Sequence, residues 1–215
     1  IAGIDIVAED ISRPLEEQRG AIVEVNAGPG LLMHLKPAKG KPRPVGQAIV
    51  DSLFPAGDKG RIPIVGIAGS KGTSLTARLM SWLLQLTGKH VGLSCRDGLF
   101  LDKRMVDKRD CANWAAGQRL LINRSVDAAV FENGAAMILG EGIAYDRCQV
   151  GIVTDAEGAE SLADFDIHNA EQLYHVLRTQ VDIVLPEGAA VLNAADPLVA
   201  RMAELCDGDV IFYGL

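Results

Sequence analysis

The chain has 215 residues, of which 48% are hydrophobic and 23% are charged, and its formal net charge is −7 at pH 7. This composition is ordinary for a globular protein with a sizeable core. The acidic balance and the lack of a basic patch argue against nucleic-acid binding, and no apolar run reaches the ~20 residues that a membrane-spanning helix needs.

The first sixty residues combine two strand-like runs with a Pro-, Gly- and Lys-rich stretch. The runs are residues 3–8 (GIDIVA) and 20–27 (GAIVEVNA). Residues 37–60 have the composition of a linker, which a short helix at Gln47–Leu53 interrupts. The expected parts are therefore residues 1–36, the linker 37–60, and one domain over residues 61–215.

From Ile62 onward, apolar runs alternate with helical patterns. Most of these runs are continuously apolar, as in sheets covered on both faces, and the alternation implies right-handed crossovers. The sequence predicts an α/β domain with a doubly wound, mostly parallel sheet that binds ligands at the C-terminal ends of its strands. Predicted strands are Ile62–Ile67, Val91–Cys95, Val126–Glu132, Val150–Asp155, Ala189–Asn193 and Val210–Tyr213. Predicted helices are Thr73–Leu86, Ala112–Leu121, Ala135–Glu141, Asn169–Val181 and Pro197–Cys206, with a hairpin at Asp97–Val106.

The segment RIPIVGIAGSKGTSLTAR has the strand–loop–helix layout of a phosphate-binding loop (P-loop). Glycines let backbone N–H groups approach phosphate oxygens, and the helix N-terminus adds partial positive charge. A working loop of this kind has Lys and then Ser or Thr directly after its last glycine. Here Thr73 follows Gly72, and Lys71 precedes that glycine, so its side chain should point elsewhere. The candidate ATP-binding residues are Gly66, Gly69, Ser70, Lys71, Gly72, Thr73 and Ser74.

Two further strand ends are predicted to lie beside this loop. Ser74 has the hydroxyl that holds Mg²⁺ in such sites, and Glu132, at the end of VDAAVFE, is placed to be a second metal ligand. The loop Asp155–Ser161 is acidic as well. Two plainer interpretations stay open, because Glu132 could be a solvated strand-end residue and Ser74 a helix N-cap.

The cysteines and histidines do not form a metal-binding pattern. The four cysteines have no CxxC spacing, which favours reduced thiols in a cytoplasmic protein over a zinc site or a disulfide framework. The chain also begins at Ile1 rather than Met. We therefore expect it to be part of a longer protein.

The first part of the chain resembles the end of the ATP-grasp domain of the cyanophycin synthetase family. The string EVNAGPG matches that family's acidic-x-Asn metal pair, which places Glu24 and Asn26 in the role of Mg²⁺ ligands. Alternation along a strand puts these two side chains on one face. Asp5 matches the further acidic residue on the neighbouring strand. The resemblance implies that Asp5, Glu24 and Asn26 bind Mg²⁺ and that ATP is the co-substrate.

The remainder resembles the central, ATP-binding domain of the Mur ligases but departs from it at the catalytic positions. Where that family has Gly-Lys-Thr, this chain has Gly72–Ser74 (Gly-Thr-Ser), and where the family has Arg-Gly-Gly, it has Ala135–Met137 (Ala-Ala-Met). The Asp-His pair of the family is replaced by Glu160–Ser161, and the lysine that the family has in the following helix is replaced by Leu177. Asn193 lies in the segment that matches the adenine end of the nucleotide site. Each lost donor costs ~3 kcal/mol of transition-state stabilisation, so the resemblance predicts a catalytically degenerate domain.

Taken together, the resemblance implies a part of an ATP- and Mg²⁺-dependent ligase that makes cyanophycin, a poly-aspartate carrying arginines. The departures are similar to those of the type that joins β-aspartyl-arginine dipeptides to the growing cyanophycin chain. The Mur-like domain would then be a scaffold, and we expect a homo-oligomer. Two alternatives stay open: a two-site synthetase that adds aspartate and arginine in turn, and a non-catalytic nucleotide-binding scaffold module.

Overall fold

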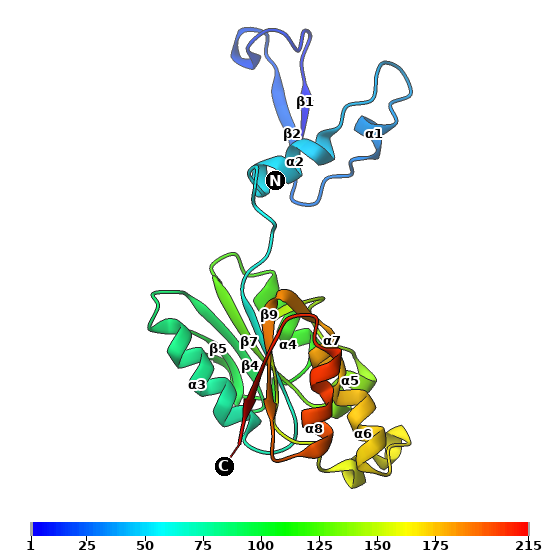
Figure 1. The fold of residues 1–215 in the computed structure, drawn as a ribbon. Helices are drawn as coiled ribbons and strands as arrows, with labels where there is room; N and C mark the ends of the chain where they lie inside the picture. Colours follow the sequence, from blue (N-terminus) through cyan, green and yellow to red (C-terminus); the bar gives the residue numbers. More distant parts are fainter. Residues whose placement is uncertain (1, 215) are drawn as a thin grey trace. The chain divides into compact units, whose positions relative to one another are not determined.

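The computed structural model describes residues 2–214, and their contacts divide the chain into two units, Ile1–Arg61 and Ile62–Leu215 (unit 1 and unit 2). Figure 1 draws unit 1 in blue to cyan and unit 2 in cyan to red. No helix among the described residues is long and apolar enough to cross a membrane. The residues predicted as a linker lie in the same unit as the first two strands.

Unit 1 contains a two-stranded antiparallel sheet and short helices. The strands pair Gly3 with Asn26 and Val7 with Ala21. Both predicted strands and the predicted helix are present, whereas the short helical segments Leu15–Glu17 and Leu32–Leu35 were not predicted. Among the described residues of this unit only Gln18 is buried, and its side-chain amide bonds the backbone of the loop between the strands. The elements are β1 (Gly3–Val7), η1 (Leu15–Glu17), β2 (Ala21–Asn26), α1 (Leu32–Leu35) and α2 (Val45–Leu53).

Unit 2 is built on one eight-stranded sheet with the order β10-β9-β8-β3-β7-β4-β5-β6. The first six strands in that order are parallel, and β5 and β6 add an antiparallel edge. The predicted fold class is therefore confirmed. The strands are β3 (Ile64–Ala68), β4 (Val91–Cys95), β5 (Gly98–Leu101), β6 (Arg104–Asp107), β7 (Ala128–Asn133), β8 (Cys148–Val153), β9 (Val184–Asn193) and β10 (Asp209–Tyr213).

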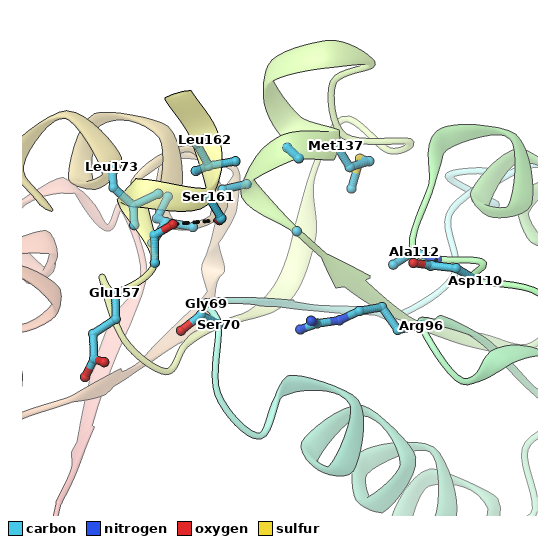
Figure 2. Close-up of a pocket in the computed structure, with 15 residues that line it drawn as sticks. Gly69, Ser70, Arg96, Asp110, Ala112, Met137, Glu157, Ser161, Leu162 and Leu173 are labelled. Atoms are coloured by element: carbon cyan, nitrogen blue, oxygen red, sulfur yellow. Dashed lines mark hydrogen bonds between the residues drawn. The ribbon is translucent and has the colours of Figure 1, made fainter. Parts of the chain in front are cut away.

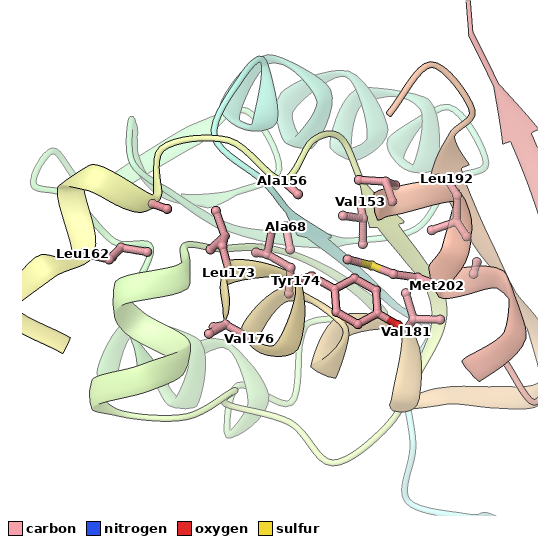
Figure 3. Packing of buried hydrophobic residues seen from close by; sticks show 14 residues of the cluster. Ala68, Val153, Ala156, Leu162, Leu173, Tyr174, Val176, Val181, Leu192 and Met202 are labelled. Carbon is pink, nitrogen blue, oxygen red and sulfur yellow. The ribbon is translucent and has the colours of Figure 1, made fainter. Parts of the chain in front are cut away.

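Helices lie on both faces of this sheet (Figure 1). On one face, α3 packs on β3, β4 and β7 with Ala77 in a core that includes Ile67 and Leu93. On the other face, α4 packs over Phe131, and α6, α7 and α8 pack around the buried cluster drawn in Figure 3, where Leu192 and Met202 lie close together. The helical segments are α3 (Thr73–Gln85), α4 (Trp114–Leu121), α5 (Ala135–Gly140), η2 (Ala159–Phe165), α6 (Ala170–Leu177), α7 (Thr179–Asp182), α8 (Pro197–Arg201) and η3 (Met202–Leu205).

Several boundaries differ from the prediction for local reasons. The strand predicted from Ile62 begins at Ile64, directly after Pro63, which lacks the N–H that a ladder needs. That strand runs to Ala68, so Gly66 lies inside β3 and not in the glycine-rich turn. The predicted helix Asn169–Val181 divides at Arg178 into α6 and α7, and Asn169 is its N-cap.

Candidate functional site

The C-terminal ends of three neighbouring strands form the candidate site in unit 2. In the sheet, β3 lies between β8 and β7. The loop Gly69–Gly72 follows β3, Glu132 is near the end of β7, and Asp155 follows β8. The loop continues directly into α3, which begins at Thr73 after Gly72 in the left-handed conformation, with φ 69°. The prediction that these three strand ends would converge is confirmed.

Glu132 lies at the centre of a closed hydrogen-bond network. Its Oε1 accepts from Thr73 Oγ1 at 2.7 Å and from Arg96 Nε at 2.7 Å. Its Oε2 accepts from Ser74 Oγ at 2.7 Å and from the Arg96 backbone N–H at 2.8 Å. The residue is only 2% exposed, so it is not a solvated strand-end residue. Each oxygen of this candidate metal ligand therefore already has two donors.

The network keeps the Glu132 carboxylate ionised. Burial by itself raises the pKa of Glu132, but the hydrogen bonds from Arg96, Thr73 and Ser74 outweigh it and leave the pKa below its ordinary value of 4.5. Arg96 also donates from Nη2 to Thr73 Oγ1 at 2.8 Å. The guanidinium is thus the counter-ion of this buried carboxylate.

Asp155 makes a second network, with the loop after β3. Its carboxylate accepts from the Ser70 backbone N–H at 3.1 Å, the Lys71 backbone N–H at 2.9 Å and Ser70 Oγ at 2.5 Å. It also accepts from Thr154 Oγ1 at 2.8 Å and from the Glu157 N–H at 3.2 Å. Burial by itself raises the pKa of Asp155, but these bonds lower it below its ordinary value. An ionised carboxylate therefore contacts the amides of the candidate phosphate loop.

The remaining loop residues have separate roles. Lys71 forms an ion pair with Glu157, in the loop that follows β8. Gly69 has a φ of 133°, and a Cβ there would overlap the Thr154 hydroxyl. The Tyr145 and Gln180 side chains occupy the space where a side chain at position 66 would lie, so glycine is required at Gly66 for packing.

Asn193 does not extend into open space at the end of β9. Its Nδ2 donates to the Thr154 carbonyl at 2.9 Å, and its Oδ1 accepts from the Ala195 N–H at 3.0 Å. Nearby, Asp196 accepts from the Ala156 N–H at 2.9 Å. These two side chains fix the backbone on either side of Asp155.

A pocket of about 270 Å³ opens beside the loop (Figure 2). Its wall includes Gly69 and Ser70, and in Figure 2 the Arg96 side chain extends toward these residues. Ser161 Oγ donates a hydrogen bond to the Gly158 carbonyl at 2.7 Å. Several of the positions at which the sequence departs from the Mur-ligase pattern lie in this wall: Ala135, Ala136, Met137, Ser161 and Leu177. Thr73 and Glu160 do not lie in it.

In unit 1, the sheet register groups the three predicted metal ligands. Asp5 is paired directly with Glu24, and Asn26 is two residues farther along the same strand. All three side chains therefore share one face. A β-bulge follows this pair, between Asp5 and Ile6, which is a common feature beside functional sites. Two carboxylates directly opposite one another repel, and a divalent cation would relieve this repulsion.

The sequence did not point to Arg96, although it is central to the site. It follows β4 directly, and β4 is the neighbour of β7 in the sheet. The only signal in the sequence was an arginine directly after a predicted strand. Recognising that this strand lies beside the strand that carries Glu132 required the strand order. Among the described residues, no group of three or more His, Cys, Asp and Glu side chains is placed to hold a metal ion.

Comparison with solved structures defines the fold class of unit 2 as that of the Mur-ligase central domain. UDP-N-acetylmuramoyl-L-alanyl-D-glutamate–2,6-diaminopimelate ligase matches 72% of this chain with 32% of its own, at a TM-score of 0.59 and 13% identity. The MurF ligase of Thermotoga maritima in complex with ADP matches 76% of this chain with 34% of its own, at a TM-score of 0.51 and 14% identity. At these identities the likeness concerns the fold alone.

Comparison of sequences gives the closer relationship: the chain is homologous, along its whole length, to part of cyanophycin synthetase. It is 41% identical over 215 residues to the enzyme of Synechocystis sp. and 40% identical over 215 residues to that of Crocosphaera subtropica. In both comparisons 100% of this chain aligns, and it spans 24% of the relative. No family model matches the sequence.

Proposed function

We propose that the chain is a stretch of an ATP-dependent ligase that polymerises β-aspartyl-arginine dipeptides into cyanophycin. In this ligase, unit 1 contributes metal ligands to an ATP-grasp site and unit 2 is a catalytically inert scaffold. The homology to part of cyanophycin synthetase supports the reaction class. One observation carries the dipeptide assignment: Ala135, Ser161 and Leu177, which stand where the Mur-ligase pattern has an arginine, a histidine and a lysine, line one pocket and are uncharged.

The reaction needs one ligase site. A terminal carboxylate of the growing chain attacks the γ-phosphorus of ATP, and ADP leaves with the electrons of the broken P–O bond. The neutral α-amino group of a dipeptide then attacks the carbonyl carbon of the acyl phosphate. The C–O bond to phosphate breaks, phosphate leaves with its electrons, and the nitrogen releases a proton to water. The oxygen donors of Asp5, Glu24 and Asn26 suit a hard cation and would hold Mg²⁺, which would supply neutralisation of the phosphate charge.

Unit 1 exposes apolar side chains on its sheet, including Ile4, Ile22 and Val25. A two-stranded sheet of this kind is only marginally stable by itself in water. This exposure supports a role in a larger domain, where these side chains would be covered. The oligomeric state of the parent is an expectation from the resemblance.

The decisive experiment measures ATP-dependent phosphate release by the full-length parent with a cyanophycin primer. One reaction contains β-aspartyl-arginine, and the other contains free aspartate and free arginine. We expect release only with the dipeptide. Release and growth of an arginine-bearing polymer with both free amino acids would favour the two-site synthetase and would mean that unit 2 is active. A failure of both reactions would favour the non-catalytic scaffold.

The variant Glu24→Gln tests the proposed role of Glu24 as a metal ligand. Glu24→Gln keeps the shape of the side chain but removes its charge, and we expect phosphate release to fall about a hundredfold, as for the loss of one electrostatic contact to the transition state. The matched control is Glu16→Gln, an exposed glutamate of the same unit. Equal rates for the two variants would contradict the role of Glu24.

A further inference from the structure

The donors that a phosphate group would use in the loop of unit 2 are already bound to a carboxylate. Backbone N–H groups are the usual phosphate donors in such loops. Here two of them, from Ser70 and Lys71, donate to Asp155, together with Ser70 Oγ. Asp155 is 5% exposed. Its two oxygens and negative charge reproduce the part of a phosphate group that the loop would contact.

The position of Asp155 is fixed from both sides. Asn193 holds the carbonyl of the preceding residue, Thr154, and Asp196 holds the N–H of the following residue, Ala156. Asp196 is itself fixed, because it caps α8 by accepting from the Leu198 and Val199 N–H groups. The backbone that carries the Asp155 carboxylate is therefore held in place beside the loop.

A cation of the chain lies where a metal ion would bind. The Arg96 guanidinium donates from Nε to Glu132 Oε1, and the Arg96 backbone N–H donates to Glu132 Oε2. Mg²⁺ needs a carboxylate lone pair at about 2.1 Å and repels a positive charge at the same oxygen. The Arg96 guanidinium also contacts Thr73, the residue at the position of the missing loop lysine. The residues of this site therefore do not fit Mg²⁺.

We propose that unit 2 supplies its own ligands to the former nucleotide site, with Asp155 in the place of a phosphate and Arg96 in the place of the metal ion. The site is thereby closed to Mg²⁺-nucleotide and held rigid without it. This inference deepens the scaffold role in the proposed function but does not depend on which reaction the parent catalyses. In this proposal, Asp155 and Arg96 keep the site closed to nucleotide, in addition to the effect of the missing loop lysine.

The anion part is tested by the melting midpoint (Tm) of the 215-residue chain. Asp155→Gly empties the place of the carboxylate, so the Tm should fall. Inorganic pyrophosphate should then raise the Tm of this variant by about 4 °C at a tenfold excess over its Kd, and that of the wild type by less than about 1 °C. Asp164→Asn removes the same charge from an exposed residue of unit 2 and should leave the wild-type response unchanged.

Asp155→Asn provides a second variant if the glycine variant does not fold. The amide keeps the size of the side chain, loses the charge, and offers an N–H₂ group that the loop amides repel. We expect a lower Tm and a partial response to pyrophosphate. If neither variant responds to pyrophosphate or Mg²⁺–ATP more than the wild type does, Asp155 does not occupy an anion site and the proposal is wrong.

The cation part is tested by binding of Mn²⁺, followed by electron paramagnetic resonance. All variants carry Glu24→Gln, so that the carboxylates of unit 1 contribute equally. Adding Arg96→Gln should create a Mn²⁺ site that the chain with Glu24→Gln alone lacks. Arg78→Gln, which removes an exposed arginine paired with Asp97, should not gain it. Equal Mn²⁺ binding with and without Arg96 would overturn the cation part.

A reversion separates this proposal from the simple loss of the lysine. Thr73→Lys alone should not confer binding of Mg²⁺–ATP, whereas adding Asp155→Asn and Arg96→Gln to it should. Strong stabilisation of the wild-type chain by Mg²⁺–ATP, or binding by Thr73→Lys alone, would overturn the proposal. Neither outcome would affect the dipeptide assay, because that assay reports on the ATP-grasp site.

Discussion

At the scale of single residues, two buried carboxylates dominate unit 2. Burying a charge is costly unless hydrogen bonds and an opposite charge compensate. Glu132 has four donors, one of which is the Arg96 guanidinium, and Asp155 has backbone and hydroxyl donors. Both carboxylates therefore stay ionised in the folded state. Their hydrogen bonds stabilise the fold only while they are deprotonated.

The pH dependence of the free energy of unfolding should reveal the contribution of the ionised Glu132 carboxylate. Because the folded-state pKa of Glu132 lies below its ordinary value of 4.5, its contribution is present above that pH and is lost as the pH falls through the lower, folded-state pKa. Glu132→Gln should cost about 2 kcal/mol at pH 7, and the difference from wild type should shrink below about pH 4.5. Urea unfolding across pH 3–7 measures it.

The control for this experiment is Glu187→Gln, which removes an exposed carboxylate from β9. We expect a change of less than about 0.5 kcal/mol at every pH. A Glu132→Gln deficit that is the same at pH 7 and at pH 3.5 would show that the side chain contributes through shape and not through charge.

At the scale of elements, β3 is the centre of the domain, and all five of its residues are buried. On the face of β3 opposite α3, the missing side chain of Gly66 makes room for a buried polar cluster. In that cluster Asn133 Nδ2 donates to Tyr145 Oη at 2.7 Å and to Gln180 Oε1 at 2.6 Å. This glycine is thus explained by the packing of β3 against α7, and no phosphate contact is needed.

Gly66→Ala should therefore destabilise unit 2. The new methyl group would overlap the Tyr145 hydroxyl and the Gln180 amide, and overpacking of this kind costs about 1–3 kcal/mol. Adding Tyr145→Phe should restore part of the loss. Thermal unfolding measures both effects. Gly140→Ala is the control, because its Cβ would make only an ordinary contact with Phe165 at 3.6 Å; a similar loss there would contradict the steric argument.

At the scale of the whole molecule, the hydrophobic core belongs to unit 2. All three buried clusters consist of residues from Ile62 onward. Among the described residues of unit 1, no hydrophobic side chain is buried. The stability of the two units should therefore differ strongly, since burial of apolar surface is the main driving force of folding.

Amide hydrogen exchange on the 215-residue chain should separate the units. Local opening exposes amides most readily where few apolar contacts oppose it. We expect the amides of β1 and β2 to exchange at least about a hundredfold faster than those of β3 and β7, read by mass spectrometry of peptides. Protection of β2 equal to that of β3 would mean that unit 1 has a stability that its exposed apolar surface does not explain.

The sequence by itself determined most of the strands and longer helices and the loss of the loop lysine. Strand β4 has the predicted bounds, and α3 begins at the predicted residue, Thr73. These features are local, because apolar periodicity, glycines and capping residues act over a few neighbouring positions. The strand pattern also put Glu24 and Asn26 on one face, whereas the pairing of Asp5 with Glu24 came from the structure. Their role as metal ligands stays a prediction.

Only the tertiary structure decided how the candidate site of unit 2 is filled. Asp155 reaches the loop from 85 positions away, and Arg96 reaches Glu132 from 36 positions away. These contacts depend on the order of the strands, which places β3 between β7 and β8 and β4 beside β7. Strand order is set by how the whole chain buries its apolar surface, and no local pattern encodes it.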